Sequence, residues 1–269
     1  MNWGSSNYLE QQRIASGHFS IEFAIIIIIA VALLWSYRYI LRPYLEKRKL
    51  HDWMGLQKSG REFQLNEQIF NTLYQGIDSS NVSRAERNRL KIDSDEFVYG
   101  EIEFPSFIAI LESVEPKKYE HFYDLGCGSG KAIFAAALCY DFDKVCGIEL
   151  LPGLYNIANR QIANLKRIVA LHGPQFAQTY QDKIDAIHFI NDDILNCDFS
   201  DADIIFINAT CFNPTTWVAI VQKFLTLKVG TRIIMTTKKM ENAAFRTIYN
   251  SQYLMSWGMN SVNAYEKIT

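Results

Sequence analysis

The most informative segment of this 269-residue chain is Asp124-Leu125-Gly126-Cys127-Gly128-Ser129-Gly130-Lys131. An apolar run over 121–123 precedes it and a helix-forming run over 131–138 follows it, which predicts a strand, a glycine turn and the start of a helix. Glycines let a backbone approach a ligand closely, and the amides of a first helical turn point toward that ligand. The dinucleotide fingerprint G-x-G-x-x-G does not fit, because Lys131 or Ile133 stands where its third glycine belongs.

An acid followed by glycines at every second position forms a different pattern, made by Asp124, Gly126, Gly128 and Gly130. This pattern resembles motif I of the class I S-adenosylmethionine-dependent methyltransferases. The resemblance implies S-adenosyl-L-methionine as the cofactor, with Asp124 bound to its amino group and the glycines admitting its carboxypropyl chain and ribose. A glycine turn that serves only strand–helix packing is the alternative.

The composition favours one main domain. With 49% hydrophobic and 21% charged residues, the chain can bury one sizeable core and a small addition. A net charge of −2 does not indicate a basic surface, so we expect no nucleic-acid partner. The five cysteines are odd in number and lack CxxC spacing, which predicts reduced core residues and no metal site.

A second feature is the apolar run near the N-terminus. Residues 23–35 are apolar without interruption, and the segment 19–41 is just long enough to span a bilayer. Lysines and arginines crowd 38–49, whereas only Arg13 precedes the run, so the remainder is expected in the cytoplasm. We therefore expect a single-pass membrane protein with a cytoplasmic catalytic domain. A buried soluble helix and a signal peptide cleaved after Ala32 are the alternatives.

The rest of the chain predicts a regular alternation of elements. Expected strands lie at 121–123, 144–149, 184–190, 203–207 and 231–235, and helices at 62–74, 131–138, 152–167 and 214–225. Residues 78–83 are polar and predict a loop, and 252–257 with 261–268 predict a closing antiparallel pair. The fold class is therefore α/β, a Rossmann-like doubly wound sheet with a small helical N-terminal extension and one transmembrane helix.

These elements define five expected regions. They are an N-terminal tail over 1–18, a transmembrane helix over 19–41, a charged connector over 42–61, a helical and loop cap over 62–110, and a methyltransferase core over 111–269.

Ligands in such sheets bind beyond the carboxyl ends of the strands, where further acids occur. Glu149 ends the second strand, 25 residues after Asp124, and its carboxylate can accept hydrogen bonds from both ribose hydroxyls. Asp193 follows the third strand. The resemblance to class I methyltransferases implies that Asp193 lies near the adenine amino group and that Ile194 packs on the adenine face. The neighbouring Asp192 is an equally placed alternative.

A narrower resemblance covers roughly residues 62–240. The chain is similar to the catalytic domain of the DOT-type, non-SET histone-lysine methyltransferases through Tyr99-Gly100-Glu101, motif I, Glu149, Asp193-Ile194-Leu195, Ile205-Phe206-Ile207-Asn208 with Phe212-x-Pro214, and Gly230-x-Arg232-Ile233. The resemblance implies that the loop with Tyr99 and Glu101 folds over the methyl donor, Glu101 helping to bind it. It also implies that Asn208 and Phe212 line a lysine channel.

Two positions depart from that family, since Ala209 replaces a second asparagine and Ile102 replaces a threonine. The resemblance gives Tyr99, Asn208 and Phe212 as candidate catalytic residues. Methyl transfer is an in-line displacement that mainly requires positioning, and an apolar channel beside a sulfonium lowers the pKa of a lysine amine.

The leading hypothesis from the sequence is a membrane-anchored protein-lysine methyltransferase. The alternatives are a methyltransferase for a lipid, quinone or other small molecule, and a non-catalytic protein that binds S-adenosylmethionine. The sequence gives no indication of the oligomeric state.

Overall fold

The computed structural model describes residues 26–41, 60–90, 102–255 and 258–269. The chain divides into two units, Met1–Lys49 and Leu50–Thr269. The tripeptide Tyr99-Gly100-Glu101 lies outside the described residues, so the predicted roles of Tyr99 and Glu101 remain predictions.

In the first unit, the described residues 26–41 are helical and end in a π-helical turn, Tyr37–Leu41. Within the described ranges, no helix has both the length and the apolar character needed to cross a membrane. The predicted transmembrane helix over 19–41 is therefore wrong. The predictions of a single-pass membrane protein, a membrane partner and a cytoplasmic catalytic domain fall with it.

The described part of the second unit is built on a seven-stranded sheet with the order β3-β2-β1-β4-β5-β7-β6. Its strands are β1 (His121–Leu125), β2 (Lys144–Ile148), β3 (Ile187–Ile190), β4 (Ile204–Ile207), β5 (Arg232–Thr236), β6 (Phe245–Met255) and β7 (Gly258–Lys267). The first five strands pair in parallel, and β7 pairs antiparallel with both β5 and β6. Because β1 lies between β2 and β4, the strand order reverses there, which is where open α/β sheets bind ligands.

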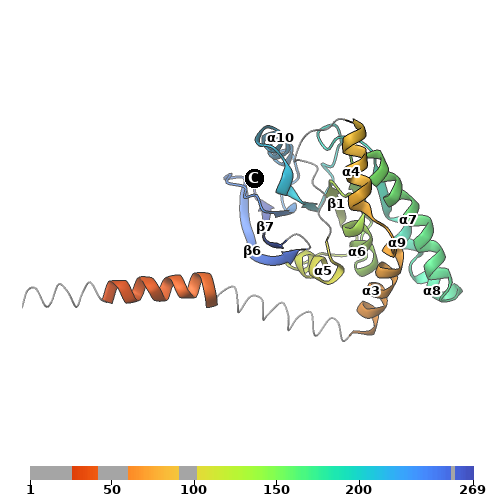
Figure 1. Cartoon of the computed structure of the whole chain (residues 1–269), viewed down its shortest axis with the longest axis horizontal. Coiled ribbons are helices and arrows are strands. Elements are labelled where there is room, and N and C mark those ends of the chain that lie inside the picture. The colour runs from red at the N-terminus through yellow and green to blue at the C-terminus, as the bar shows by residue number, and fades with distance from the viewer. Residues whose placement is uncertain (1–25, 42–59, 91–101, 256–257) are drawn as a thin grey trace, which may run out of the picture. The chain divides into compact units, whose positions relative to one another are not determined.

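Helices cover both faces of this sheet (Figure 1). They are α3 (Arg61–Tyr74), α4 (Ser79–Leu90), α5 (Phe104–Glu112), α6 (Lys131–Cys139), α7 (Pro152–Ala170), α8 (Pro174–Thr179), α9 (Gln181–Asp185), the short 3-10 turn η3 (Ala209–Cys211) and α10 (Pro214–Phe224). Alternate residues of β1 belong to separate hydrophobic clusters. Phe122 packs with residues of α3, α5 and α6, whereas Tyr123 packs with residues of α10. The sheet is thus buried on both sides, as its continuous apolar strands require.

The predicted Rossmann-like α/β alternation is confirmed, but local predictions fail in two places. Residues 78–83, predicted as a loop, include the start of α4. Residues 184–185, predicted as strand, end α9, and β3 begins only at Ile187. The closing pair exists but is longer than predicted, because β6 begins at Phe245 and β7 at Gly258. Of the cysteines, Cys127, Cys146 and Cys197 are buried free thiols, as predicted, and the free thiol of Cys139 is half-buried.

Candidate active site

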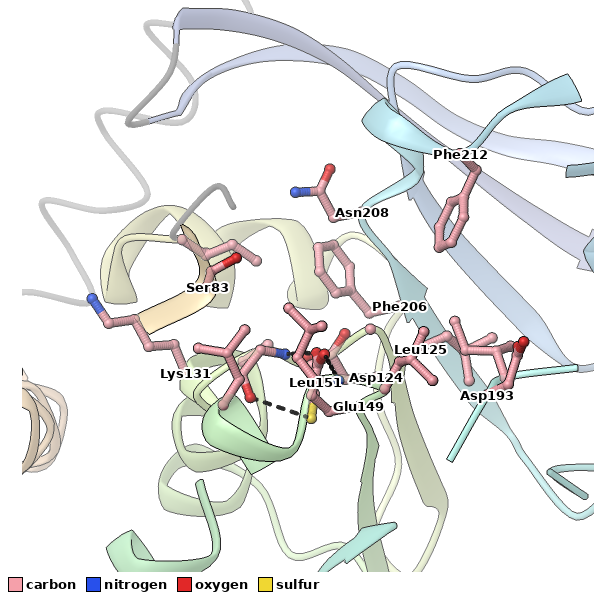
Figure 2. A pocket seen from close by; sticks show the side chains of 18 of the residues that line it. Ser83, Asp124, Leu125, Lys131, Glu149, Leu151, Asp193, Phe206, Asn208 and Phe212 are labelled. Atoms are coloured by element: carbon pink, nitrogen blue, oxygen red, sulfur yellow. Dashed lines mark hydrogen bonds between the residues drawn. The ribbon is translucent and has the colours of Figure 1, made fainter. Parts of the chain in front are cut away.

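A pocket lies at the carboxyl ends of the central strands (Figure 2). The structure brings together there most of the residues singled out in the sequence: Asp124, Gly126, Gly128, Glu149, Asp193, Ile194, Asn208 and Phe212. They converge because β1, β2, β3 and β4 run parallel, so their carboxyl ends, and the segments that follow them, lie on the same side of the sheet.

The glycine turn is tied to the neighbouring strand by its backbone. The amides of Gly126 and Cys127 both donate to the Ile148 carbonyl, at 2.9 and 3.0 Å. Gly130 has φ +84° before α6, and a Cβ there would lie 2.8 Å from the Phe189 ring. Gly130 therefore lets the turn pack against β3, whereas Gly126 and Gly128 line the pocket.

Glu149 is held by backbone amides in the pocket floor. Its Oε1 accepts a hydrogen bond from the Leu151 amide and its Oε2 one from the Gly128 amide, both at 2.8 Å. Burial nevertheless raises the pKa of Glu149, although these amides act in the opposite direction. Because each carboxylate oxygen can accept more than one hydrogen bond, Glu149 can still bind a pair of hydroxyls.

The Asp124 carboxyl differs from that of Glu149 in having no hydrogen-bond partner in the described part of the chain. Its side chain is only 3% exposed. Burial, and then the charge of Glu149, hold its pKa well above the ordinary value of 3.8. A buried acid without a partner is costly when ionised, and a cation beside it removes that cost. The pair is therefore suited to a positively charged ligand.

The two neighbouring aspartates after β3 have different surroundings. Asp193 lines the pocket, and its Oδ1 accepts a hydrogen bond from the Leu195 amide at 2.8 Å. Asp192 is exposed, and its Oδ1 accepts from Asn196 Nδ2 and from the Asp193 amide. These two hydrogen bonds lower the pKa of Asp192. Of the two aspartates, the geometry favours Asp193 as the one that contacts a ligand.

Asn208 and Phe212 extend from the segment after β4, across the pocket from Asp124 and Glu149 (Figure 2). Phe212 is half-buried and packs against the cluster that contains α10. The segment is fixed by Asn213, whose Oδ1 accepts the Thr216 amide at 2.8 Å and caps α10. The pocket thus has an acidic side, on β1 and β2, and an uncharged side with an amide and aromatic rings.

The helices before the core also contribute to the site. The Tyr74 hydroxyl donates to the Ser129 carbonyl in the glycine turn at 3.0 Å, and Glu86 of α4 accepts the Gly153 amide at 2.5 Å. Ser83 of α4 lines the pocket, a role missed because 78–83 was predicted as a loop. Leu151 was missed too, although an apolar residue just after an acidic strand end is a recognisable signal.

The family model described as "Histone methylation protein DOT1" matches residues 82–265 of the chain. A curated protein of Debaryomyces hansenii, "Histone-lysine N-methyltransferase, H3 lysine-79 specific", is 28% identical over 62% of this chain. A protein of the same description from Dictyostelium discoideum is 29% identical over 60% of the chain. The matches cover only 15% and 9% of those relatives' own lengths.

Solved structures with lower similarity were also found. An RNA methyltransferase from Salinibacter ruber in complex with S-adenosyl-L-homocysteine is 23% identical, with a TM-score of 0.44. The match covers 61% of this chain and 91% of that chain. TrmN from Thermus thermophilus is 17% identical, with a TM-score of 0.48, over 68% of this chain and 53% of that chain.

Proposed function

Because the chain belongs to the DOT1 family of histone methylation proteins, we propose that it transfers a methyl group from S-adenosylmethionine to the amine of a lysine in a protein. The family match confirms the resemblance to the DOT-type methyltransferases, and the proposed enzyme class and cofactor are those that the resemblance implied. The acceptor is proposed as a protein lysine because the curated relatives carry that activity in their names.

The observation that carries the proposal is the buried Asp124 carboxyl beside Glu149 in the pocket, which accepts no hydrogen bond from any residue that the structure describes. S-adenosylmethionine has an ammonium group and a sulfonium centre, so it is the kind of cation that this pair of acids would stabilise. In the proposed arrangement Asp124 binds the ammonium, Glu149 the ribose hydroxyls and Asp193 the adenine amino group. Ile194 lies beside Asp193 in the pocket and would pack on the adenine ring.

When bound, the cofactor supplies a methyl group on a positively charged sulfur. The chain's own task is to hold an uncharged amine in line with that methyl group. Asn208 and Phe212 lie across the pocket from the acids, and Phe206, which pairs with Asp124 across β1 and β4, also lines the pocket. Aromatic walls exclude water, and a charged lysine loses solvation there, so its pKa falls and the reactive neutral amine becomes more populated. No separate base is then required.

The test is a transfer assay with the full chain, methyl-labelled S-adenosylmethionine, and two acceptor pools, purified core histones and a whole-cell protein extract. Total lipids serve as a third pool. Asp124→Asn should abolish transfer, and the matched control Asp192→Asn, which changes an adjacent exposed acid outside the pocket, should retain it.

Label recovered as methyl-lysine after hydrolysis of a protein band supports the proposal. Label that appears only in the lipid fraction contradicts the protein acceptor. Bound donor with no label in any pool contradicts the activity itself.

A further inference from the structure

Asn208 is held by hydroxyl groups that the sequence did not connect with it. Its Oδ1 accepts a hydrogen bond from Thr210 Oγ1 at 2.8 Å and another from Thr236 Oγ1 at 2.6 Å. Thr210 belongs to η3, just after β4, whereas Thr236 is the fully buried last residue of β5. Two hydrogen bonds from different elements fix the rotation of a carboxamide, which a single bond leaves free to turn.

The residue after Thr236, Thr237, has a strained backbone conformation and contacts Thr210. It has φ +65°, although it is β-branched, and the Lys238 amide donates to the Thr236 carbonyl at 2.7 Å around it. This is a γ-turn of the rare positive-φ type. The turn brings Thr237 Oγ1 to 2.9 Å from Thr210 Oγ1, and Thr237 also donates to Asn260 Oδ1 at 3.0 Å. Strain of this kind persists where the surrounding structure requires the conformation, often at functional sites.

We propose that Thr210 and Thr236 are positioning residues that hold Asn208 by its oxygen, so that its amide nitrogen serves the pocket. Within the described residues that nitrogen has no hydrogen-bond partner, and Asn208 lines the pocket (Figure 2). The side chain therefore offers N–H donors to an oxygen of the molecule that enters. This inference rests on the proposed function and adds to it the residues that orient the uncharged side of the site.

The test compares hydroxyl-deleting substitutions at the two ends of β5. Thr236→Val removes the hydroxyl beside Asn208 with little change of shape. The control is Thr231→Val. Thr231 directly precedes the first residue of β5, and its equally buried hydroxyl donates to the Ala202 carbonyl, away from Asn208. We expect Thr236→Val to lower kcat about tenfold with the Kd for S-adenosylmethionine within twofold, because positioning acts on the reacting geometry. Thr231→Val should leave kcat within twofold at a similar loss of Tm.

Thr236→Ser should restore most of the activity, and Thr210→Val, at a half-buried site, gives a second variant if Thr236→Val does not fold. An unchanged kcat in Thr236→Val, or a loss of kcat that Thr231→Val reproduces at equal Tm, overturns the proposal.

A second readout does not depend on activity. The side-chain amide signals of Asn208 in an NMR spectrum, assigned by their disappearance in Asn208→Asp, should shift or broaden in Thr236→Val and stay unchanged in Thr231→Val. Unchanged signals in Thr236→Val overturn the positioning role. If the wild-type chain labels no protein while these signals respond as expected, the proposed function fails and the positioning of Asn208 stands.

Discussion

Asp201 and Asp124 lie at opposite edges of the same sheet, and their carboxylates have opposite surroundings. Asp201, just before β4, accepts hydrogen bonds from the Tyr123 hydroxyl at 2.6 Å and from Lys144 Nζ at 3.0 Å, and its Oδ2 lies 2.9 Å from His121 Nδ1. Asp124 is in β1 at the carboxyl edge. Within the described residues its side chain has no such partner, and it lies in the pocket beside another acid.

The pKa values of the two carboxyls differ accordingly. Burial alone would raise the pKa of Asp201, but hydrogen bonds from Tyr123 and Lys144 outweigh it and hold the pKa at about 2. Burial and the charge of Glu149 hold the pKa of Asp124 well above its ordinary value. Asp201, near the amino ends of the strands, thus stabilises the fold. Asp124, near their carboxyl ends, is unfavourable when ionised, and a cationic ligand would remove that cost. Such a division is expected where function and stability compete.

The largest expected effect comes from Asp124→Asn. Removing the charge that binds the ammonium should weaken S-adenosylmethionine binding at least about 100-fold, since truncating one partner of a buried charge pair costs several kcal/mol. The same substitution should stabilise the ligand-free protein at neutral pH by about 1 kcal/mol, because a buried charge without a partner is lost. Calorimetric titration measures the donor affinity and thermal unfolding measures the stability. A variant that binds the donor more weakly and is also less stable than wild type would show that Asp124 stabilises the fold.

Asp193→Asn and Asp192→Asn should differ in their effect on donor binding, although the two residues are adjacent. Asp193 lines the pocket and Asp192 does not, so only the first should weaken donor binding, by about tenfold, the loss of one charge-assisted hydrogen bond. Direct titration of both variants measures the difference. Equal donor affinities in the two variants would contradict the assignment, and a larger loss in Asp192→Asn would exchange the roles of the two residues.

Asp201→Asn should act on stability alone. Its carboxylate is 44% exposed, so solvent screening limits the expected loss to about 1 kcal/mol of unfolding free energy. Donor affinity should stay within twofold of wild type, because Asp201 lies at the edge away from the pocket. Urea unfolding and the same titration check the two statements, and a marked loss of donor binding would show that the edges are coupled.

The smallest expected effect is a difference in the pH dependence of stability. Asp201 has a lowered pKa in the folded protein, so its contribution is present above its ordinary pKa of 3.8 and is lost as the pH falls toward about 2. Asp124 has a raised pKa, so above its ordinary pKa of 3.8 the folded protein binds more protons than the unfolded chain and becomes less stable as the pH rises toward the raised value. Unfolding curves of Asp201→Asn should therefore approach those of wild type near pH 2. Curves of Asp124→Asn should do so below about pH 4.

The sequence predicted the sheet and the pocket floor well because both follow from short-range patterns. Apolar runs that end in acids place Asp124 and Glu149 at the carboxyl edge, and parallel strands bring such ends together. The start of α4 was missed because residues 78–83 are nearly all polar and show no apolar stripe. The Asp78 carboxylate accepts the Asn81 amide near the start of that helix. Such a signal is equally common in turns.

The uncharged side of the site was only partly predictable. Asn208 and Phe212 came from the resemblance to a family, and the structure places both in the pocket. Thr210 and Thr236 are 26 residues apart, and no local pattern relates a hydroxyl in η3 to one at the end of β5. Their meeting depends on the register in which β4 pairs with β5 and is visible only in three dimensions.

Proton release on donor binding shows whether Asp124 is a buried acid that a cationic donor ionises. Titrations of the wild-type chain with S-adenosylmethionine from about pH 4, near the ordinary pKa of an aspartate, to pH 8, in buffers of different ionisation enthalpy, count the protons released. We expect the affinity to rise with pH while a proton is released, and this release to be lost in Asp124→Asn but not in Asp192→Asn. An affinity independent of pH, or an equal release in Asp124→Asn, would contradict it.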